Sequence, residues 1–335
     1  MTLNSSGPIS LAGTTAGVSI EIENGGNGTT QISLNDAAVR SLAGVPSGAI
    51  TMPTNFYGKS NRVSISYTFT SSTTNASLNI SSIGGYSSGK SDITVTVNSG
   101  VYLWANSTGN YGLNLSGGTT GDTLNLVNNG YIMGQGGHES NGGPALNIGT
   151  GIGLTINNGG YIGGGGGAGY DAYSRYRNGG GGGAGGGVGN NPCCFVSGGS
   201  GGSIGGSGGT GGSACVSCIL YRGGGGGGRI FPGSGGAGGY CSGGSGGGAG
   251  GGGGGNGLSG TGGNGGSGSS AGSTSPYCCN NQGGGGGGGW GAAGGGGRTA
   301  QGNSHAGYCG GKAINKNGKT VTFSAGCSRV YGAVS

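Results

Sequence analysis

Charged residues are scarce in this chain. Asp, Glu, Lys and Arg make up 6% of its 335 residues, against about 25% in typical globular proteins. None of the seven acidic residues follows Asp171, and the thirteen Lys and Arg residues are spread along the chain. A nucleic-acid-binding protein concentrates basic residues on one face or stripe, so we expect no nucleic-acid partner.

Long apolar stretches are also missing. No run of 18 apolar residues occurs, so no segment is predicted to span a membrane. Residues 1–5 show neither the basic nor the apolar region of a signal peptide, and we expect none. Leu, Ile, Val and Phe are too few for the core of an ordinary enzyme, because the glycine that replaces them has no side chain to bury.

Glycine is abundant, at 103 of 335 residues, and it is concentrated in residues 159–312. All nine cysteines lie beyond residue 192. Together with the confinement of the acids to the first half, these distributions divide the chain into residues 1–61, 62–165 and 166–335. We expect a mostly β fold with few α-helices: a β-rich module, then a repeat of short strands, then a glycine-rich part.

The first part combines strand-like and helix-like patterns. Apolar and acidic residues alternate over residues 20–23, which are predicted to pair with residues 32–34 in a hairpin across the turn at 25–28. A short helix is predicted next, with Asn35 as its N-cap and Gly44 at its C-terminal end.

Residues 32–60, ISLNDAAVRSLAGVPSGAITMPTNFYGKS, resemble an N-terminal module of tail and tail-fibre proteins of tailed bacteriophages. The resemblance implies that residues 1–61 attach the chain to other tail or baseplate proteins of a virion. A generic β-rich cap is the alternative interpretation of the same residues.

Residues 62–165 contain a repeat. Three lines align: SDITVTVNSGVYLWA (91–105), GDTLNLVNNGYIMGQ (121–135) and GLTINNGGYIGGG (153–165). Asn98 then matches Asn128, and Tyr131 matches Tyr161, each 30 residues apart. A fixed period with alternating apolar residues and Asn-Gly turns indicates stacked β rungs with an asparagine ladder. We expect a short β-helix or β-prism, and similar lines occur in phage fibre tips, so this part resembles that family too.

Two motifs in the repeat match catalytic patterns. Residues 84–91, GGYSSGKS, fit a phosphate-binding loop, but such a loop needs a helix after its lysine, and here a strand pattern follows. Asp92 and Asp122, if stacked on neighbouring rungs, would approach the ~5–5.5 Å carboxyl separation of a retaining glycosidase. Both also stand where Asp commonly caps a turn, so we assign no catalytic residue.

Residues 166–335 alternate nearly pure glycine runs with inserts that hold the cysteines, aromatics and prolines. Such glycine content is commonly associated with disorder, but the grouping of these residues in the inserts favours an ordered block. An extended helix with three residues per turn has no internal hydrogen bonds, and bare glycine backbones can pack closely and bond to one another.

This block resembles the distal receptor-binding adhesins of T-even-type phages. The resemblance implies a sandwich of polyglycine-II helices whose connecting loops bind the host. The nine cysteines depart from that family.

We predict structural disulfides, since each would stabilise the folded chain by ~2–4 kcal/mol by restricting the freedom of the unfolded chain. The candidates are Cys193, Cys194, Cys215, Cys218, Cys241, Cys278, Cys279, Cys309 and Cys327. The CxxC spacing of Cys215 and Cys218 also occurs in zinc and redox sites, but only His305 is available as a further ligand in this half. We predict no metal and no cofactor, and because nine is odd, one thiol stays free or pairs between chains.

Aromatic and arginine side chains in or beside the inserts are the candidate receptor contacts, because Tyr, Trp and Arg are favoured anchors of recognition surfaces. They are Tyr173, Arg175, Tyr176, Arg177, Tyr221, Arg222, Arg229, Phe231, Tyr277, Trp290 and Arg298. A basic surface without acids suits phosphate or carboxylate groups of a bacterial envelope. Alternatively, the aromatics fill a core that glycine cannot, and we expect both roles. Residues 312–334 predict a closing hairpin with its turn at Asn317 and Gly318.

With the resemblance, these features predict a non-enzymatic tail-fibre adhesin, located in the virion tail and acting at the host surface. Its receptor is a glycan, lipopolysaccharide or outer-membrane protein, and a homotrimer is expected, as is common for fibres. Two alternatives stay open: a tail-spike polysaccharide depolymerase on a β-helix, which needs clustered acids, and a structural or ice-binding protein, which needs strict Gly-x-x periodicity and flat Thr/Ala faces.

Overall fold

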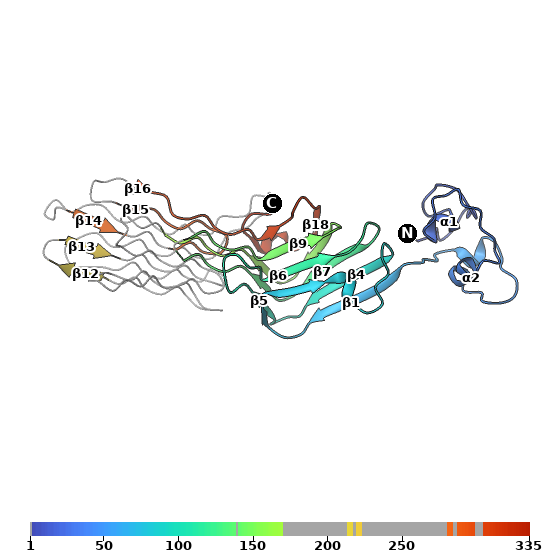
Figure 1. Ribbon diagram of the computed structural model, residues 1–335, viewed down its shortest axis with the longest axis horizontal. Helices are drawn as coiled ribbons and strands as arrows, with labels where there is room; N and C mark the ends of the chain where they lie inside the picture. Colours follow the sequence, from blue (N-terminus) through green and yellow to red (C-terminus); the bar gives the residue numbers. More distant parts are fainter. Residues whose placement is uncertain are drawn as a thin grey trace. The chain divides into compact units, whose positions relative to one another are not determined.

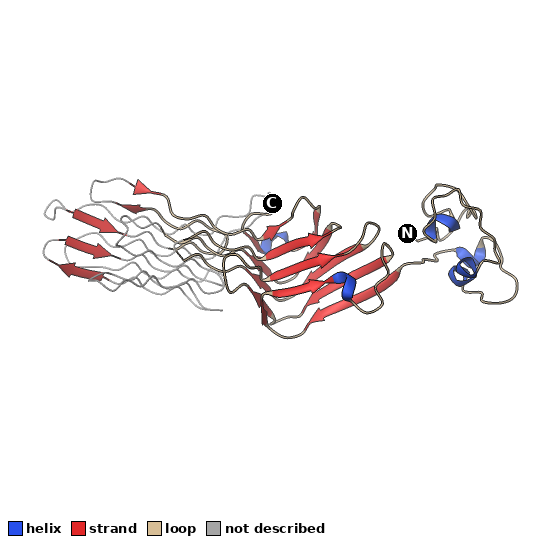
Figure 2. Cartoon of the chain, viewed as in Figure 1, coloured by secondary structure: helices blue, strands red, loops and turns tan. Residues whose placement is uncertain are grey.

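The computed structural model describes residues 2–138, 140–169, 213–216, 219–222, 280–283, 287–298 and 304–335 (Figure 1). Two compact units are present: residues 1–65 with 84–92, and residues 66–83 with 93–335. The described elements are mostly strands, which confirms the β-rich expectation (Figure 2). The helical elements are α1 (Ile20–Glu23), α2 (Ala37–Ala43), η1 (Thr54–Phe56), η2 (Ile80–Ser82) and η3 (Cys327–Arg329). No helix among the described residues is long and apolar enough to cross a membrane.

Helix α2 forms as predicted but begins one residue later. Its N-cap is Asp36, whose carboxylate accepts a hydrogen bond from the Ser33 N–H at 2.7 Å, and Gly44 ends it with a left-handed φ of 71°. Its apolar face packs in a small core, which explains why so short a helix persists. That core consists of Leu3, Ile20, Val39, Leu42, Ala43 and Phe56.

The hairpin predicted for residues 20–23 is wrong, because these residues form the single helical turn α1. Ser19 caps the turn by accepting the Ile22 N–H at 3.3 Å. Glu21 is 2% exposed, and its carboxylate accepts hydrogen bonds from the backbone N–H groups of Asn27, at 3.0 Å, and of Gly28. Alternation of apolar and acidic residues predicts a strand only when the acids face water, and here they fold a loop around themselves.

The second unit is built on a β-solenoid of three sheets. The first sheet orders β1 (Val63–Phe69), β4 (Ser91–Val97), β7 (Thr123–Asn128), β10 (Leu154–Asn158) and β18 (Val321–Ala325). The second orders β2 (Thr73–Thr74), β5 (Tyr102–Trp104), β8 (Tyr131–Met133), β11 (Tyr161–Gly163) and β19 (Val330–Tyr331). The third orders β3 (Ala76–Asn79), β6 (Leu113–Gly117), β9 (Leu146–Thr150) and β17 (Ile314–Asn315). Alternate residues of each strand fill the interior, as Ile93, Val95 and Val97 of β4 do.

The predicted 30-residue register holds between the later rungs. Tyr161 pairs with Tyr131, and Asn158 pairs with Asn128. It fails for the first aligned line, where Tyr102 pairs with Tyr131 and Asn98 is exposed although Asn128 is buried. The burial pattern sets strand register, because a shift by one residue would turn the apolar side chains outward.

Asparagine ladders connect the rungs, as predicted. At the corner between the first and second sheets, the Asn128 Nδ2 donates to the Asn158 Oδ1 at 2.7 Å. On the third sheet, Asn147 donates to Asn114 at 2.8 Å and accepts from Asn315 at 2.9 Å. Stacked amides satisfy both their donors and acceptors, so each rung is tied to the next by side chains as well as by backbone.

The closing hairpin predicted for residues 312–334 is wrong, although its turn is present. Asn317 and Gly318 have positive φ values of 48° and 75°. The flanking strands β17 and β18 do not pair with each other; they pair in parallel with β9 and β10, in different sheets. The turn is therefore a corner of the solenoid, and the tail adds β18 and β19 to the stack.

Residues 164–313, which hold most of the glycine runs and are called the glycine-rich block from here on, are an insertion within one rung. Strands β10 and β11 begin that rung, and β17 completes it in the third sheet. The connection at this corner lengthens from rung to rung: residue 75, residues 105–112, residues 134–145, and finally residues 164–313. Both ends of the block are thus held by the same solenoid layer.

Candidate functional site

The described glycine segments beside the solenoid bond to one another through their backbones. The N–H groups of Gly134 and Gly137 donate to the carbonyls of Gly163 and Gly166, at 2.8 Å each. Three more pairs of bonds show the same three-residue spacing of donors and acceptors. Gly142 and Ala145 donate to Cys309 and Lys312. Gly165 and Ala168 donate to Gly143 and Ser140, and Gly311 and Tyr308 donate to Gly165 and Ala168. In every pair, donors and acceptors are both three residues apart.

These segments approach so closely that only glycine fits. A Cβ atom at Gly165 would lie 1.8 Å from the Gln135 carbonyl oxygen, and one at Gly142 would lie 1.9 Å from the Gly165 oxygen. At Gly311, a Cβ atom would lie 2.0 Å from the Gly143 oxygen. Residues 162–169 are buried, so backbone takes the place of side chains in this part of the core.

Trp290 is a core residue, which corrects its prediction as a receptor contact. It is 1% exposed and packs with Met133 beside the rings of Tyr161 and Tyr331, at centroid distances of 6.5 and 5.6 Å. Its ring covers Gly163, where a Cβ atom would lie 2.5 Å from Cδ2. The register aligns Gly163 with Met133 and Met133 with Trp104, so Trp290 fills the place that a large side chain takes in the earlier rungs.

A column of tyrosines runs along the second sheet next to Trp290. Tyr102, Tyr131, Tyr161 and Tyr331 stack with centroid distances of 4.6, 5.5 and 6.2 Å and interplanar angles of 7–9°. The Arg329 guanidinium lies 5.3 Å from the Tyr161 ring centroid. Burial raises the pKa of Tyr131, and the neighbouring Tyr102 and Tyr161 raise it further, while Arg329 lowers it. Burial and Tyr161 raise the pKa of Tyr331.

The stack predicts a loss of stability in alkali. In the unfolded chain the phenols ionise near pH 10, whereas the raised pKa keeps Tyr131 neutral to higher pH in the folded chain. The contribution of the stack to the free energy of unfolding should therefore be constant below about pH 9 and fall as the pH rises through 10. Urea unfolding between about pH 8 and pH 11, with phenolate absorbance, measures this.

The matched variants are Tyr131→Phe, which should reduce the alkaline fall, and Tyr67→Phe, on the exposed part of β1, which should not. Superimposable alkaline curves for Tyr131→Phe and the unchanged chain would contradict this assignment.

A fourth sheet brings strands from distant parts of the glycine-rich block together. Its order is β12 (Ser213–Val216), β13 (Ile219–Arg222), β14 (Asn280–Gly283), β15 (Gly297–Arg298) and β16 (Ser304–His305) (Figure 1). Arg222 is in register with Gly283, and Gly283 with Arg298, so two predicted receptor contacts occupy one row, two strands apart. Neighbouring strands are about 4.8 Å apart, which places the two backbones about 10 Å apart. Tyr221 precedes Arg222 and is in register with Gln282.

The other predicted receptor contacts lie outside the described residues. They are Tyr173, Arg175, Tyr176, Arg177, Arg229, Phe231 and Tyr277. Arg329, which reasoning from the sequence missed, lies beside the tyrosine column. Its position on the tail after a regular strand pattern gave no indication of that contact.

Two cysteines correct the disulfide prediction. Cys309 and Cys327 are free thiols, and Cys309 is exposed. Cys215 lies in β12, opposite Leu220 of β13. The remaining candidates, Cys193, Cys194, Cys218, Cys241, Cys278 and Cys279, lie outside the described residues. No group of three or more His, Cys, Asp or Glu residues that could hold a metal ion occurs in the described part of the chain.

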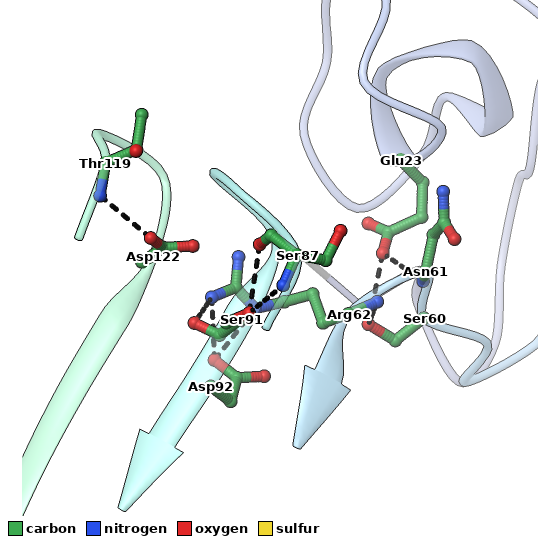
Figure 3. Close-up of polar contacts among 9 residues, drawn as sticks. All are labelled: Glu23, Ser60, Asn61, Arg62, Ser87, Ser91, Asp92, Thr119 and Asp122. Carbon is green, nitrogen blue, oxygen red and sulfur yellow. Dashed lines mark hydrogen bonds and ion pairs between the residues drawn. The ribbon is translucent and has the colours of Figure 1, made fainter. Parts of the chain in front are cut away.

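Asp92 and Asp122, the two acids considered for catalysis, both have partners within the chain (Figure 3). Asp92 forms an ion pair with Arg62, at 2.8 Å. Asp122 is buried and accepts the Thr119 N–H at 2.9 Å, which is the turn-capping role considered for it.

The motif that matches a phosphate-binding loop has a strand after its lysine, as predicted, since Lys90 is followed directly by β4. The Lys90 ammonium donates to the Asn24 carbonyl at 3.1 Å. The backbone therefore offers no helix N-terminus at this point to hold a phosphate.

Comparison with known proteins gives one solved structure. No family model matches the chain, and no curated protein matches it. A chain described as "Crystal structure of the gp37-gp38 adhesin tip complex of the bacteriophage S16 long tail fiber" matches over 97% of this chain and 100% of that chain. The sequence identity is 16% and the TM-score is 0.32.

Proposed function

We propose that this chain is a non-enzymatic adhesin of a tailed bacteriophage. Residues 1–61 join it to other tail or baseplate proteins, the solenoid is a rigid mount, and the glycine-rich block is a polyglycine-II sandwich that presents receptor-binding loops. The assembled state in the virion tail is a homotrimer, and the receptor is a component of the bacterial surface. This is the adhesin role that the description of the S16 complex names for that complex.

The observation that carries the proposal is the three-residue spacing of the lateral backbone bonds. An α-helix or a β-strand does not repeat every three residues, whereas a polyglycine-II helix does, with its N–H and C=O groups directed outward. The bonds from Gly134 and Gly137 to Gly163 and Gly166 have this spacing on both segments. Such a lattice is stiff, because each segment is bonded to several neighbours.

The anchoring of the block supports the same role. A recognition surface gains affinity when it is pre-organised, because less freedom is lost on binding. Here both ends of the block are fixed in one rung, and Trp290 fastens it to the solenoid side chains. The register places Arg222 and Arg298 in one row, two strands apart, and arginine is the residue type that binds phosphate or carboxylate groups of an envelope in a bidentate manner.

A cell-binding experiment tests the proposal. The labelled full chain is added to a panel of Gram-negative strains, and attachment is measured by flow cytometry for the unchanged chain and for an Arg222→Ala, Arg298→Ala variant. On a strain that binds the chain, the double variant should lose about tenfold or more in attachment, as expected when two anchor residues are removed.

The matched control removes the same charge elsewhere. A Lys316→Ala, Lys319→Ala variant lowers the net charge equally on the solenoid tail, and its attachment should be nearly unchanged. Equal attachment by both double variants, or no attachment to any strain, would refute the adhesin role of this row.

A further inference from the structure

A shallow groove crosses the outward face of the first sheet, on β4, β7, β10 and β18. Its volume is about 270 Å³. It is lined by Thr94, Asn125, Leu126, Val127, Thr155, Asn157 and Ser324. None of these side chains is ionisable, although the chain as a whole has a formal net charge of +6.

The amides of the groove differ from the asparagines that form the ladders. Asn128, Asn147 and Asn158 bond to neighbouring rungs in ladders. Asn125 and Asn157 make no side-chain hydrogen bond to any residue in the part of the chain that the structure describes, and Asn157 is exposed. Their donors and acceptors are available to a ligand.

The register arranges these groups regularly. Thr155 is paired with Asn125 on one side and with Thr322 on the other, and Asn157 is paired with Val127. With a strand spacing of about 4.8 Å, the four strands present polar groups across about 14 Å. Apolar Val127 lies between them and gives the floor a nonpolar patch.

We propose that this groove binds a neutral oligosaccharide that lies across the strands. An amide offers both donors and acceptors, and a hydroxyl does the same, so the lining matches a ligand whose own groups are hydroxyls. The lack of ionisable lining groups disfavours anionic and cationic ligands, since a charged ligand would lose solvation without gaining a partner. The site lies on the solenoid, and the inference does not depend on the proposed function of the glycine block.

Saturation-transfer-difference NMR with the full chain tests this, with maltoheptaose and laminariheptaose as neutral probes and polygalacturonate as a charged one. At least one neutral probe should bind at millimolar concentration. An Asn125→Ala, Asn157→Ala variant should weaken binding about tenfold, and Thr155→Val about fivefold, the loss expected for hydrogen bonds to uncharged groups. The melting temperature should not change, because these amides have no partners within the described chain.

Thr68→Val is the matched control, since Thr68 is exposed on β1 of the same sheet but does not line the groove. Its binding should equal that of the unchanged chain. The proposal would be overturned if neither neutral probe binds or if the chain prefers polygalacturonate. Thermal hysteresis without probe binding, which is the mark of an ice-binding protein, would also overturn it. Loss of probe binding in the Arg222→Ala, Arg298→Ala variant but not in the groove variants would overturn it too, by moving the sugar to the other site.

Discussion

Replacement of Trp290 by alanine is expected to lower the free energy of unfolding by about 3–5 kcal/mol, the usual loss for a large buried aromatic. Trp290 is a side chain of the glycine-rich block that packs against the tyrosine column, and it is 1% exposed. Its removal leaves Gly163 uncovered, and glycine cannot collapse to fill the space. Thermal and urea unfolding of the full chain measure the effect.

Trp290→Phe is the informative companion variant. Within the described part of the chain, the indole Nε1 has no hydrogen-bond partner, so the ring contributes by shape and apolar area. Phenylalanine should therefore retain more than half of the stability lost in the alanine variant. If Trp290→Ala melts like the unchanged chain but fails to attach to cells, the residue is a receptor contact after all, and its assignment to the core is wrong.

Replacement of Gly165 by alanine is expected to disrupt the lateral packing of the glycine segments. The added methyl group would lie 1.8 Å from the Gln135 carbonyl oxygen and 2.3 Å from its carbon, so backbone would have to move. Overpacking a core costs about 1–3 kcal/mol where side chains can yield, and backbone yields less readily, so we expect about 3 kcal/mol or more. The melting temperature and the amide exchange of residues 134–145 report the change.

Gly109→Ala is the control for this experiment. Gly109 lies in the corresponding connection of an earlier rung, and a Cβ atom there would meet nothing within 4 Å. That variant should be as stable as the unchanged chain, or slightly more stable because the unfolded chain loses freedom. Equal stability of Gly165→Ala and Gly109→Ala would show that the glycine segments are not packed as described.

The solenoid could be predicted from the sequence because its period and its alternation are both local. The match of Tyr131 with Tyr161 and the asparagine ladder followed from a fixed spacing. The spacing alone misled at Asn98, where the odd-numbered residues of β4 face inward and shift the register. For residues 312–334 the turn was predicted correctly and the strand partners were not. A two-residue turn does not reveal whether the strands beside it pair with each other or with strands of earlier rungs.

Non-local packing accounts for most of what the sequence did not reveal. Alternation at residues 20–23 indicated a strand. The helical turn is explained by the burial of Glu21, whose carboxylate bonds to the backbone of the following loop. Trp290 looked like an exposed anchor because it stands in a glycine run. The place it fills is defined by Gly163, more than a hundred residues earlier in the chain.

The candidate site was predicted by residue type and not by arrangement. Tyr221, Arg222 and Arg298 were predicted as receptor contacts from their residue types, but the row that Arg222 and Arg298 share depends on pairing among three separate strands. No local pattern encodes such a register. Two of the cysteines predicted to form disulfides, Cys309 and Cys327, are free. The sequence did not reveal this, because the spacing of cysteines along a chain does not determine which thiols meet.

The insertion of residues 164–313 at a single corner has a consequence for how such a protein can diversify. The chain leaves after β11 and returns at β17, so the layers on either side are complete without it. A cassette of different length or composition can be exchanged at that corner, provided that it supplies a large apolar side chain in the place of Trp290, which covers Gly163 beside the tyrosine column. Recombination between related genes that keep this one contact would thus replace the whole segment in one step.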